Sequence, residues 1–161
     1  MRQFPICKEE VKFYEKVIKL LGWKEKNGEL YKNMFPILVN GKKLIKLGEN
    51  PIYDKNVIAF RPLRNNKHCQ YLINYLFEKE SGVSDILTIK NENIYSAKIL
   101  DHHEEIMIEV DNCRTEVEAK FIVIFQFYFG DTEKYMKKIR QFDEEYYSKE
   151  KSKVKKTYKK L

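Results

Sequence analysis

Glycine, proline, cysteine and tryptophan are scarce in this chain, whose 161 residues include six glycines, four prolines, three cysteines and one tryptophan. Because the glycines are scattered singly, the sequence has no place for a glycine-rich loop that holds nucleotide phosphates. Ten phenylalanines and eleven tyrosines, with so little glycine and proline, exclude a collagen-like or low-complexity chain. We therefore expect a globular protein without nucleotide-driven chemistry.

Long hydrophobic runs and paired cysteines are also missing. No apolar stretch approaches the roughly 18 to 20 residues that span a bilayer, and the first residues contain no hydrophobic region of a signal peptide. Cys7, Cys69 and Cys113 are far apart and odd in number, which favours reduced thiols over disulfides or a CxxC metal site. These absences predict a cytoplasmic protein with no membrane contact and no cofactor.

Positive charge is concentrated at the C-terminal end. Residues 149–161 carry a net charge of +6, which leaves 24 basic and 23 acidic residues in the rest of the chain. Lysine binds phosphates without reading base edges, and a lysine cluster gains affinity for nucleic acid by releasing counterions. The alternative is a solubilising, partly helical terminus. The lysines concerned are Lys149, Lys151, Lys153, Lys155, Lys156, Lys159 and Lys160.

Apolar residues at i, i+3 and i+4 indicate two helices in the first half of the chain. The first covers 8–21 and is followed by Gly22, and the second covers about 65–80. Between them, Asn40-Gly41 separates two apolar runs, which is the strongest short signal of a β-hairpin, and 56–60 has the pattern of a short strand.

The second half combines strands and helices. Short alternating segments at 86–90, 94–100 and 106–110 predict an antiparallel meander, because the connections are too short for parallel crossovers. We expect Ile106, Ile108 and Val110 to share its buried face. Thr115-x-x-Glu118 is a capping box before an apolar helix that ends near Gly130, and a fourth helix follows. That helix carries Tyr135, Ile139, Phe142 and Tyr146 on one stripe.

These elements predict an α+β fold in which an antiparallel sheet is packed by helices as an α-β-β-β-α core. An N-terminal helix with a β-hairpin and a C-terminal basic helix complete it. We divide the chain into a helix and hairpin at 1–61, the core at 62–130, and a C-terminal helix with its lysine-rich end at 131–161.

Candidate chemistry is sparse. The segment from Asp101 through His102 and His103 to Glu105 collects metal-ligating side chains, but neighbouring residues in a turn point apart, so we expect no metal there. A metal-dependent nuclease built on these residues is the enzymatic alternative. Cys69 lies on an apolar stripe and is expected to be an inert thiol, whereas Cys113 precedes a helix N-terminus, which could lower its pKa. No nucleophile, base and orienting group come together, so we expect no enzyme.

The order of a helix, three antiparallel strands and a helix over 65–129 resembles the double-stranded RNA-binding domain. In that family, basic residues at the start of the final helix meet phosphates. The resemblance is carried by Arg114, Ala119 and Lys120, and it implies RNA contacts at Arg114 and Lys120. Glu116 and Glu118 depart from the family's pattern at this position.

The segment 62–129 is also similar in order and spacing to the phage ABA-sandwich domain, a small module of phage and prophage proteins. This resemblance implies an accessory protein of a phage or prophage. The expected function is therefore a non-enzymatic interaction protein that binds a host protein or nucleoprotein, such as a defence complex. The alternative is a sequence-independent nucleic-acid-binding module that uses the lysine-rich end.

Overall fold

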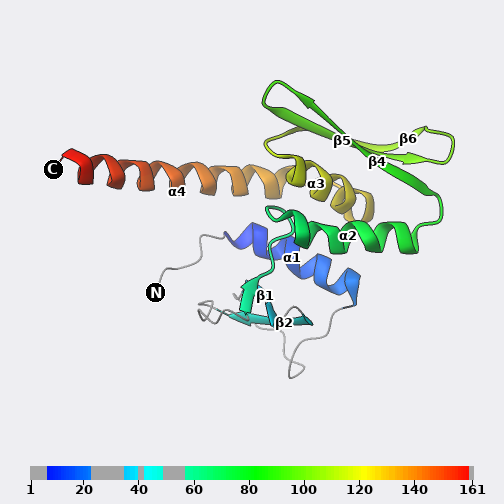
Figure 1. Cartoon of the computed structure of the whole chain (residues 1–161), viewed down its shortest axis with the longest axis horizontal. Coiled ribbons are helices and arrows are strands. Elements are labelled where there is room, and N and C mark those ends of the chain that lie inside the picture. Colours follow the sequence, from blue (N-terminus) through cyan, green and yellow to red (C-terminus); the bar gives the residue numbers. More distant parts are fainter. Residues whose placement is uncertain (1–6, 23–34, 40–41, 49–56, 160–161) are drawn as a thin grey trace.

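A computed structural model describes the backbone of residues 7–22, 35–39, 42–48 and 57–159, and the side chains of 7–22 and 60–146. Four helices and two three-stranded antiparallel sheets form the described part of the chain (Figure 1). The Asn40-Gly41 turn and Lys160 lie outside the described residues. The fold is α+β, as the sequence pattern predicts.

The N-terminal elements are α1 (Lys8–Leu21) and a sheet with strand order β2-β1-β3. Its strands are β1 (Phe35–Val39), β2 (Lys42–Gly48) and β3 (Val57–Ala59). Gly22 ends α1 in the left-handed conformation, at φ 69°, which glycine adopts without steric cost. The predicted helix, hairpin and short strand are therefore confirmed.

The second sheet is a meander of β4 (Val83–Asn91), β5 (Ile94–Asp101) and β6 (Ile106–Cys113), in that spatial order. It follows α2 (Asn66–Lys79), which Asn65 caps by accepting a hydrogen bond from the His68 amide. On its buried face, Ala97 and Ile99 are fully buried and lie opposite Val110 and Ile108 of β6. The helix and meander predicted at 65–110 are confirmed.

One predicted position on this sheet is wrong. Ile99 pairs with Ile108, but the next residue of β5, Leu100, pairs with Ile106, so the register shifts by one residue at Met107. Successive residues of a strand point to opposite faces, and this bulge therefore turns Ile106 away from the face that holds Ile108. Ile106 is 51% exposed instead of buried.

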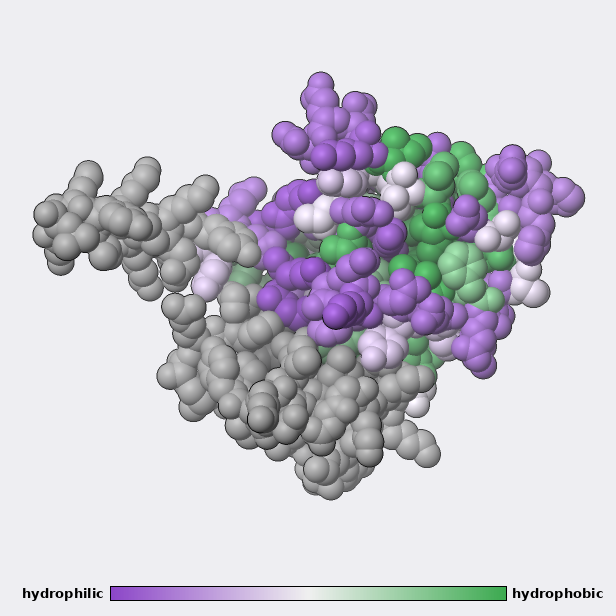
Figure 2. Space-filling view, in the orientation of Figure 1, coloured by the Kyte–Doolittle hydropathy of each residue, from purple (hydrophilic) through white to green (hydrophobic). Residues whose placement is uncertain are grey.

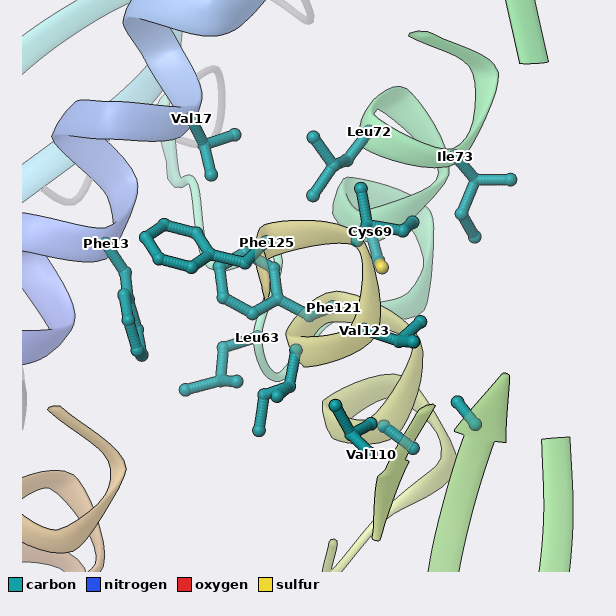
Figure 3. Packing of buried hydrophobic residues seen from close by; sticks show 14 of the residues in the cluster. Phe13, Val17, Leu63, Cys69, Leu72, Ile73, Val110, Phe121, Val123 and Phe125 are labelled. Carbon is teal, nitrogen blue, oxygen red and sulfur yellow. The ribbon is translucent and has the colours of Figure 1, made fainter. Parts of the chain in front are cut away.

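The core lies around α3 (Glu116–Phe129), which packs between the meander and the other helices (Figure 1). Thr115 caps α3 by accepting from the Glu118 amide, and the Glu118 carboxylate accepts from the Arg114 amide. Figure 3 shows Phe121 and Phe125 of α3 with Phe13 of α1 in one cluster. The structure confirms the capping box and the apolar helix predicted after it.

The last helix, α4 (Glu133–Lys159), is 27 residues long and contacts α1. Met136 and Ile139 are buried in the common core, while Tyr135 and Phe142 are partly buried against it. The helix does not stop at the first lysines, because it continues to Lys159 and projects beyond the rest of the fold (Figure 1).

Candidate functional site: a groove and an open sheet face

A chain of ion pairs connects α1, α3 and α4 with the segment that precedes α2, and sequence patterns alone did not reveal it. The Glu10 carboxylate of α1 is fully buried and accepts hydrogen bonds from the side chains of Tyr14, Arg61 and Arg64. The shortest contacts are 2.6 Å from Tyr14 Oη and 2.7 Å from Arg64 Nη2. Burial, and then the charge of Glu10, raise the pKa of Tyr14 well above its usual value, so its hydroxyl stays a donor.

The ion-pair chain continues into α4 and α3. Arg64 also donates to Asp143, at 2.6 Å, and Asp143 accepts a second hydrogen bond from Arg114, at 2.8 Å. Burial disfavours the charge on Arg64, but its hydrogen bonds to Glu10 and the charges of Glu10 and Asp143 outweigh this and raise the pKa of the guanidinium. Arg114 and Arg140 both lie within 4 Å of Glu118, at 3.6 and 3.7 Å.

Arg140 connects these ion pairs to a surface groove. Its guanidinium donates to the backbone carbonyl of Asn112 at 2.7 Å, so it joins α4 to the end of β6. The groove has a volume of about 860 Å³ and runs along β6, with α3 and α4 on its other sides. We call it the β6–α4 groove. It is lined by Glu109, Val110, Asp111, Asn112, Cys113, Ile122, Gln126, Thr132, Glu133, Met136, Lys137, Arg140, Gln141 and Glu144.

The opposite face of the β4-β5-β6 sheet is uncovered in the described part of the chain. The helices lie on one side of this sheet (Figure 1), and the register places a second set of apolar residues on the other side. Figure 2 shows hydrophobic side chains at the surface in the region of the sheet. We call this surface the open sheet face. Its exposed apolar residues are Leu87 at 43%, Ile89 at 41%, Ile94 at 49% and Ile106 at 51%.

The basic residues singled out on the body of the protein are paired with acids. Arg114 lies against Asp143 and Glu118, and the Lys120 ammonium is 3.2 Å from Glu116 of the same helix. These contacts offset the positive charge that a phosphate would meet at Arg114 and Lys120. The predicted lysines from Lys149 to Lys159 are not gathered on the body, because they follow one another along the projecting part of α4.

The acidic and histidine-containing loop forms a hydrogen-bonded turn. The Asp101 carboxylate accepts from the amides of His103 and Glu105, and these hydrogen bonds, that of Glu105 first, lower its pKa. The His102 imidazole lies 2.7 Å from the carbonyl oxygen of Ser81, away from that turn. Within the described ranges, no three metal-ligating side chains are placed to hold an ion.

The thiols are buried. Cys69 is inaccessible, which confirms the predicted burial, and burial raises its pKa to about 12, so its inertness stays a prediction. The suggestion that a helix N-terminus lowers the pKa of Cys113 is wrong. Burial, and then the charge of Glu118, raise it to about 12. A thiol at this pKa is protonated at neutral pH and is a poor nucleophile.

Comparisons with known proteins add no relative. No family model, curated protein or solved structure matches this chain. No helix in the described part of the chain combines the length and the apolar composition of a membrane span.

Proposed function

We propose that this chain is a non-enzymatic interaction protein that binds a partner protein through the open sheet face. Four large aliphatic side chains there are each more than 40% exposed and lie on three adjacent strands. Several exposed apolar side chains on one face favour an interaction site, because their burial is favourable by about 25 cal/mol per Å². The same face carries the Lys98–Glu109 ion pair, in the row of Leu87. This exposed set of residues is the observation that carries the proposal.

The sparse chemistry of the described residues supports binding over catalysis. Cys69 and Cys113 are buried and protonated at neutral pH, and the Asp101 carboxylate is engaged by its own turn. The proposal that the partner comes from a phage host is based on the resemblance of 62–129 to the phage ABA-sandwich domain. We accordingly propose a phage or prophage accessory protein whose partner is a host protein or nucleoprotein, such as a defence complex.

The test is affinity purification from host lysate with matched variants. Leu87→Glu places a charge on the open sheet face, and Phe77→Glu places one on α2, at a similarly exposed side chain. We expect a stoichiometric partner with the wild type and with Phe77→Glu, and its loss with Leu87→Glu. Retention of the partner by Leu87→Glu, or self-association that Leu87→Glu abolishes, would contradict the proposal.

Nucleic-acid binding by residues 149–160 is the second candidate function. It is favoured by the continuation of α4 to Lys159, which carries the lysine-rich segment away from the acidic residues of the body (Figure 1). If about five lysines contact duplex phosphates, the slope of log K against log salt is near −4.5. Raising the salt from about 50 to 200 mM should then weaken binding by roughly 500-fold.

Deletion of residues 149–161 should remove this binding and leave the urea midpoint of the body unchanged, although the helical circular dichroism falls with the loss of the end of α4. Fluorescence anisotropy with two unrelated duplexes of equal length measures both affinity and sequence independence. Binding that survives the deletion with an unchanged salt slope would place the contact on the body, where Arg114→Ala and Lys120→Ala are the next variants.

A further inference from the structure

We propose that the β6–α4 groove binds an extended basic segment of a polypeptide, which adds to the sheet as a fourth strand beside β6. This site is distinct from the open sheet face and goes beyond the proposed function. Three observations carry it: the position of β6 at the sheet edge, the dimensions of the groove, and the charge of its lining.

β6 is an edge strand. The order β4-β5-β6 leaves one side of β6 unpaired within the described residues, and the groove follows five consecutive residues of that strand, Glu109 to Cys113. In an antiparallel sheet, alternate residues of an edge strand direct their backbone N–H and C=O groups away from the sheet. The Asn112 carbonyl already accepts from Arg140, and Asn112, at φ 57°, belongs to a second bulge of β6. An extended peptide can use the outward groups of the residues before Asn112, which is the binding mode called strand addition.

The sheet is too narrow to cover both helices that line the groove. Three strands spaced about 4.8 Å apart span roughly 10 Å, the diameter of one helix. The sheet packs on α3, whereas the groove separates β6 from one face of α4. A strand added beside β6 would cover that face as the present strands cover α3.

The helical side of the groove has a length suited to an extended segment. Its α4 residues are spaced by three or four positions from Glu133 to Glu144, so they share one helix face. At about 1.5 Å per residue this face is roughly 16 Å long, which corresponds to about five residues of a β-strand. The interior side of the groove is apolar, because it is formed by Val110, Ile122 and Met136.

The charge of the lining favours a basic occupant. Asp111, Glu133 and Glu144 are exposed at the groove. Arg140 is engaged with Glu118 and with the carbonyl of Asn112, so Lys137 is the remaining basic residue of the lining. Glu109, which also lines the groove, lies 3.8 Å from Lys98. An extended segment with apolar residues toward Val110 and Met136, and lysine or arginine toward the acids, complements this surface.

The probes are three synthetic peptides of about six residues. One alternates valine with lysine, the second alternates valine with glutamate, and the third is the valine-lysine peptide with alternate backbone nitrogens methylated. Methylation removes the N–H donors that face β6 but keeps the charge and the side chains. Binding is followed by isothermal titration and by nuclear magnetic resonance of the full chain.

We expect the valine-lysine peptide to bind and to shift the amide signals of 107–113. The methylated and the glutamate peptides should bind at least tenfold more weakly. In the protein, the double substitution Asp111→Asn with Glu144→Gln should lower the affinity for the valine-lysine peptide by about 2- to 30-fold. This change corresponds to the loss of two solvent-exposed charge pairs. Glu145→Gln is the matched control, since Glu145 neighbours Glu144 on α4 but does not line the groove.

Equal binding of the methylated peptide, an equal effect of Glu145→Gln, or no binding of the valine-lysine peptide would overturn the proposal. Peptide-induced shifts of the amide signals of the open sheet face, instead of those of β6, would also overturn it. Leu87→Glu should leave peptide binding unchanged, which separates failure of this site from failure of the proposed function. A concentration-dependent dimer that shows the β6 shifts without any peptide would indicate a second copy as the occupant and would also overturn it.

Discussion

Replacement of Glu10 by glutamine should destabilise the folded chain by about 3–5 kcal/mol, because it removes the buried carboxylate that three donor side chains share. The Glu10 side chain is fully buried and receives hydrogen bonds from Tyr14, Arg61 and Arg64. Glutamine has one oxygen that can accept, and its amide nitrogen would face donors. The substitution therefore leaves the partly buried guanidinium groups of Arg61 and Arg64 facing a neutral side chain, with Arg64 still paired with Asp143.

The assay is reversible unfolding in urea, followed by circular dichroism, with a thermal scan in parallel. For a chain of this length, 3–5 kcal/mol corresponds to a fall in Tm of about 6–20 °C. Glu9→Gln is the matched control, because Glu9 occupies the same turn of α1 but pairs at 3.6 Å with Lys138, whose side chain is 66% exposed. That pair should contribute less than about 1 kcal/mol.

The reasoning fails if Glu10→Gln costs no more than Glu9→Gln. Such a result would mean that water or rearranged side chains satisfy Arg61 and Arg64 in the absence of the carboxylate, and that the ion-pair chain contributes little to stability. Unchanged m-values in both variants would show that the surface exposed on unfolding is the same, so the midpoints compare stability directly.

Two further predictions concern titratable groups. Burial lowers the pKa of His68, whose Nδ1 accepts from the Arg61 amide, so the unfolded chain takes up the proton first and the free energy of unfolding should fall as the pH drops below about 6.5. The urea midpoint of the wild type should be lower at pH 5.5 than at pH 7.5. This difference between the two midpoints should shrink in His68→Gln but not in His102→Gln. Cys69 and Cys113, with pKa values raised to about 12 by burial, should resist a thiol reagent at pH 8 until the chain is unfolded. Mass spectrometry measures this, and rapid labelling of native Cys113 would refute the burial argument.

Local signals predicted the helices well. Residues 8–21 form a helix with the expected bounds because an apolar stripe and Gly22 define both its buried face and its end. Thr115 and Glu118 fix the start of α3 through hydrogen bonds between residues three or four positions apart. Such contacts are determined by the local sequence, so the pattern is sufficient to recognise them.

Contacts between distant segments could not be predicted in this way. Glu10 meets Arg61 and Arg64 across 51 and 54 residues, and nothing in the first turn of a helix distinguishes a buried carboxylate from a solvated one. The bulge at Met107 likewise depends on how β6 pairs with β5, so alternation alone placed Ile106 on the wrong face. The groove combines β6 with α4, and its existence follows from the packing of α4 and not from any motif.

The length of α4 also determines how the charge of this protein acts at a distance. From Asp143, which is held by Arg64 and Arg114, the helix continues for sixteen more residues to Lys159, a rise of about 24 Å. At physiological ionic strength the Debye length is about 8 Å, so the end of the helix lies roughly three screening lengths from that anchor. An approaching polyanion therefore meets two electrostatically separate objects, a nearly neutral body and a strongly basic helix end. The formal net charge of +7 describes neither of them.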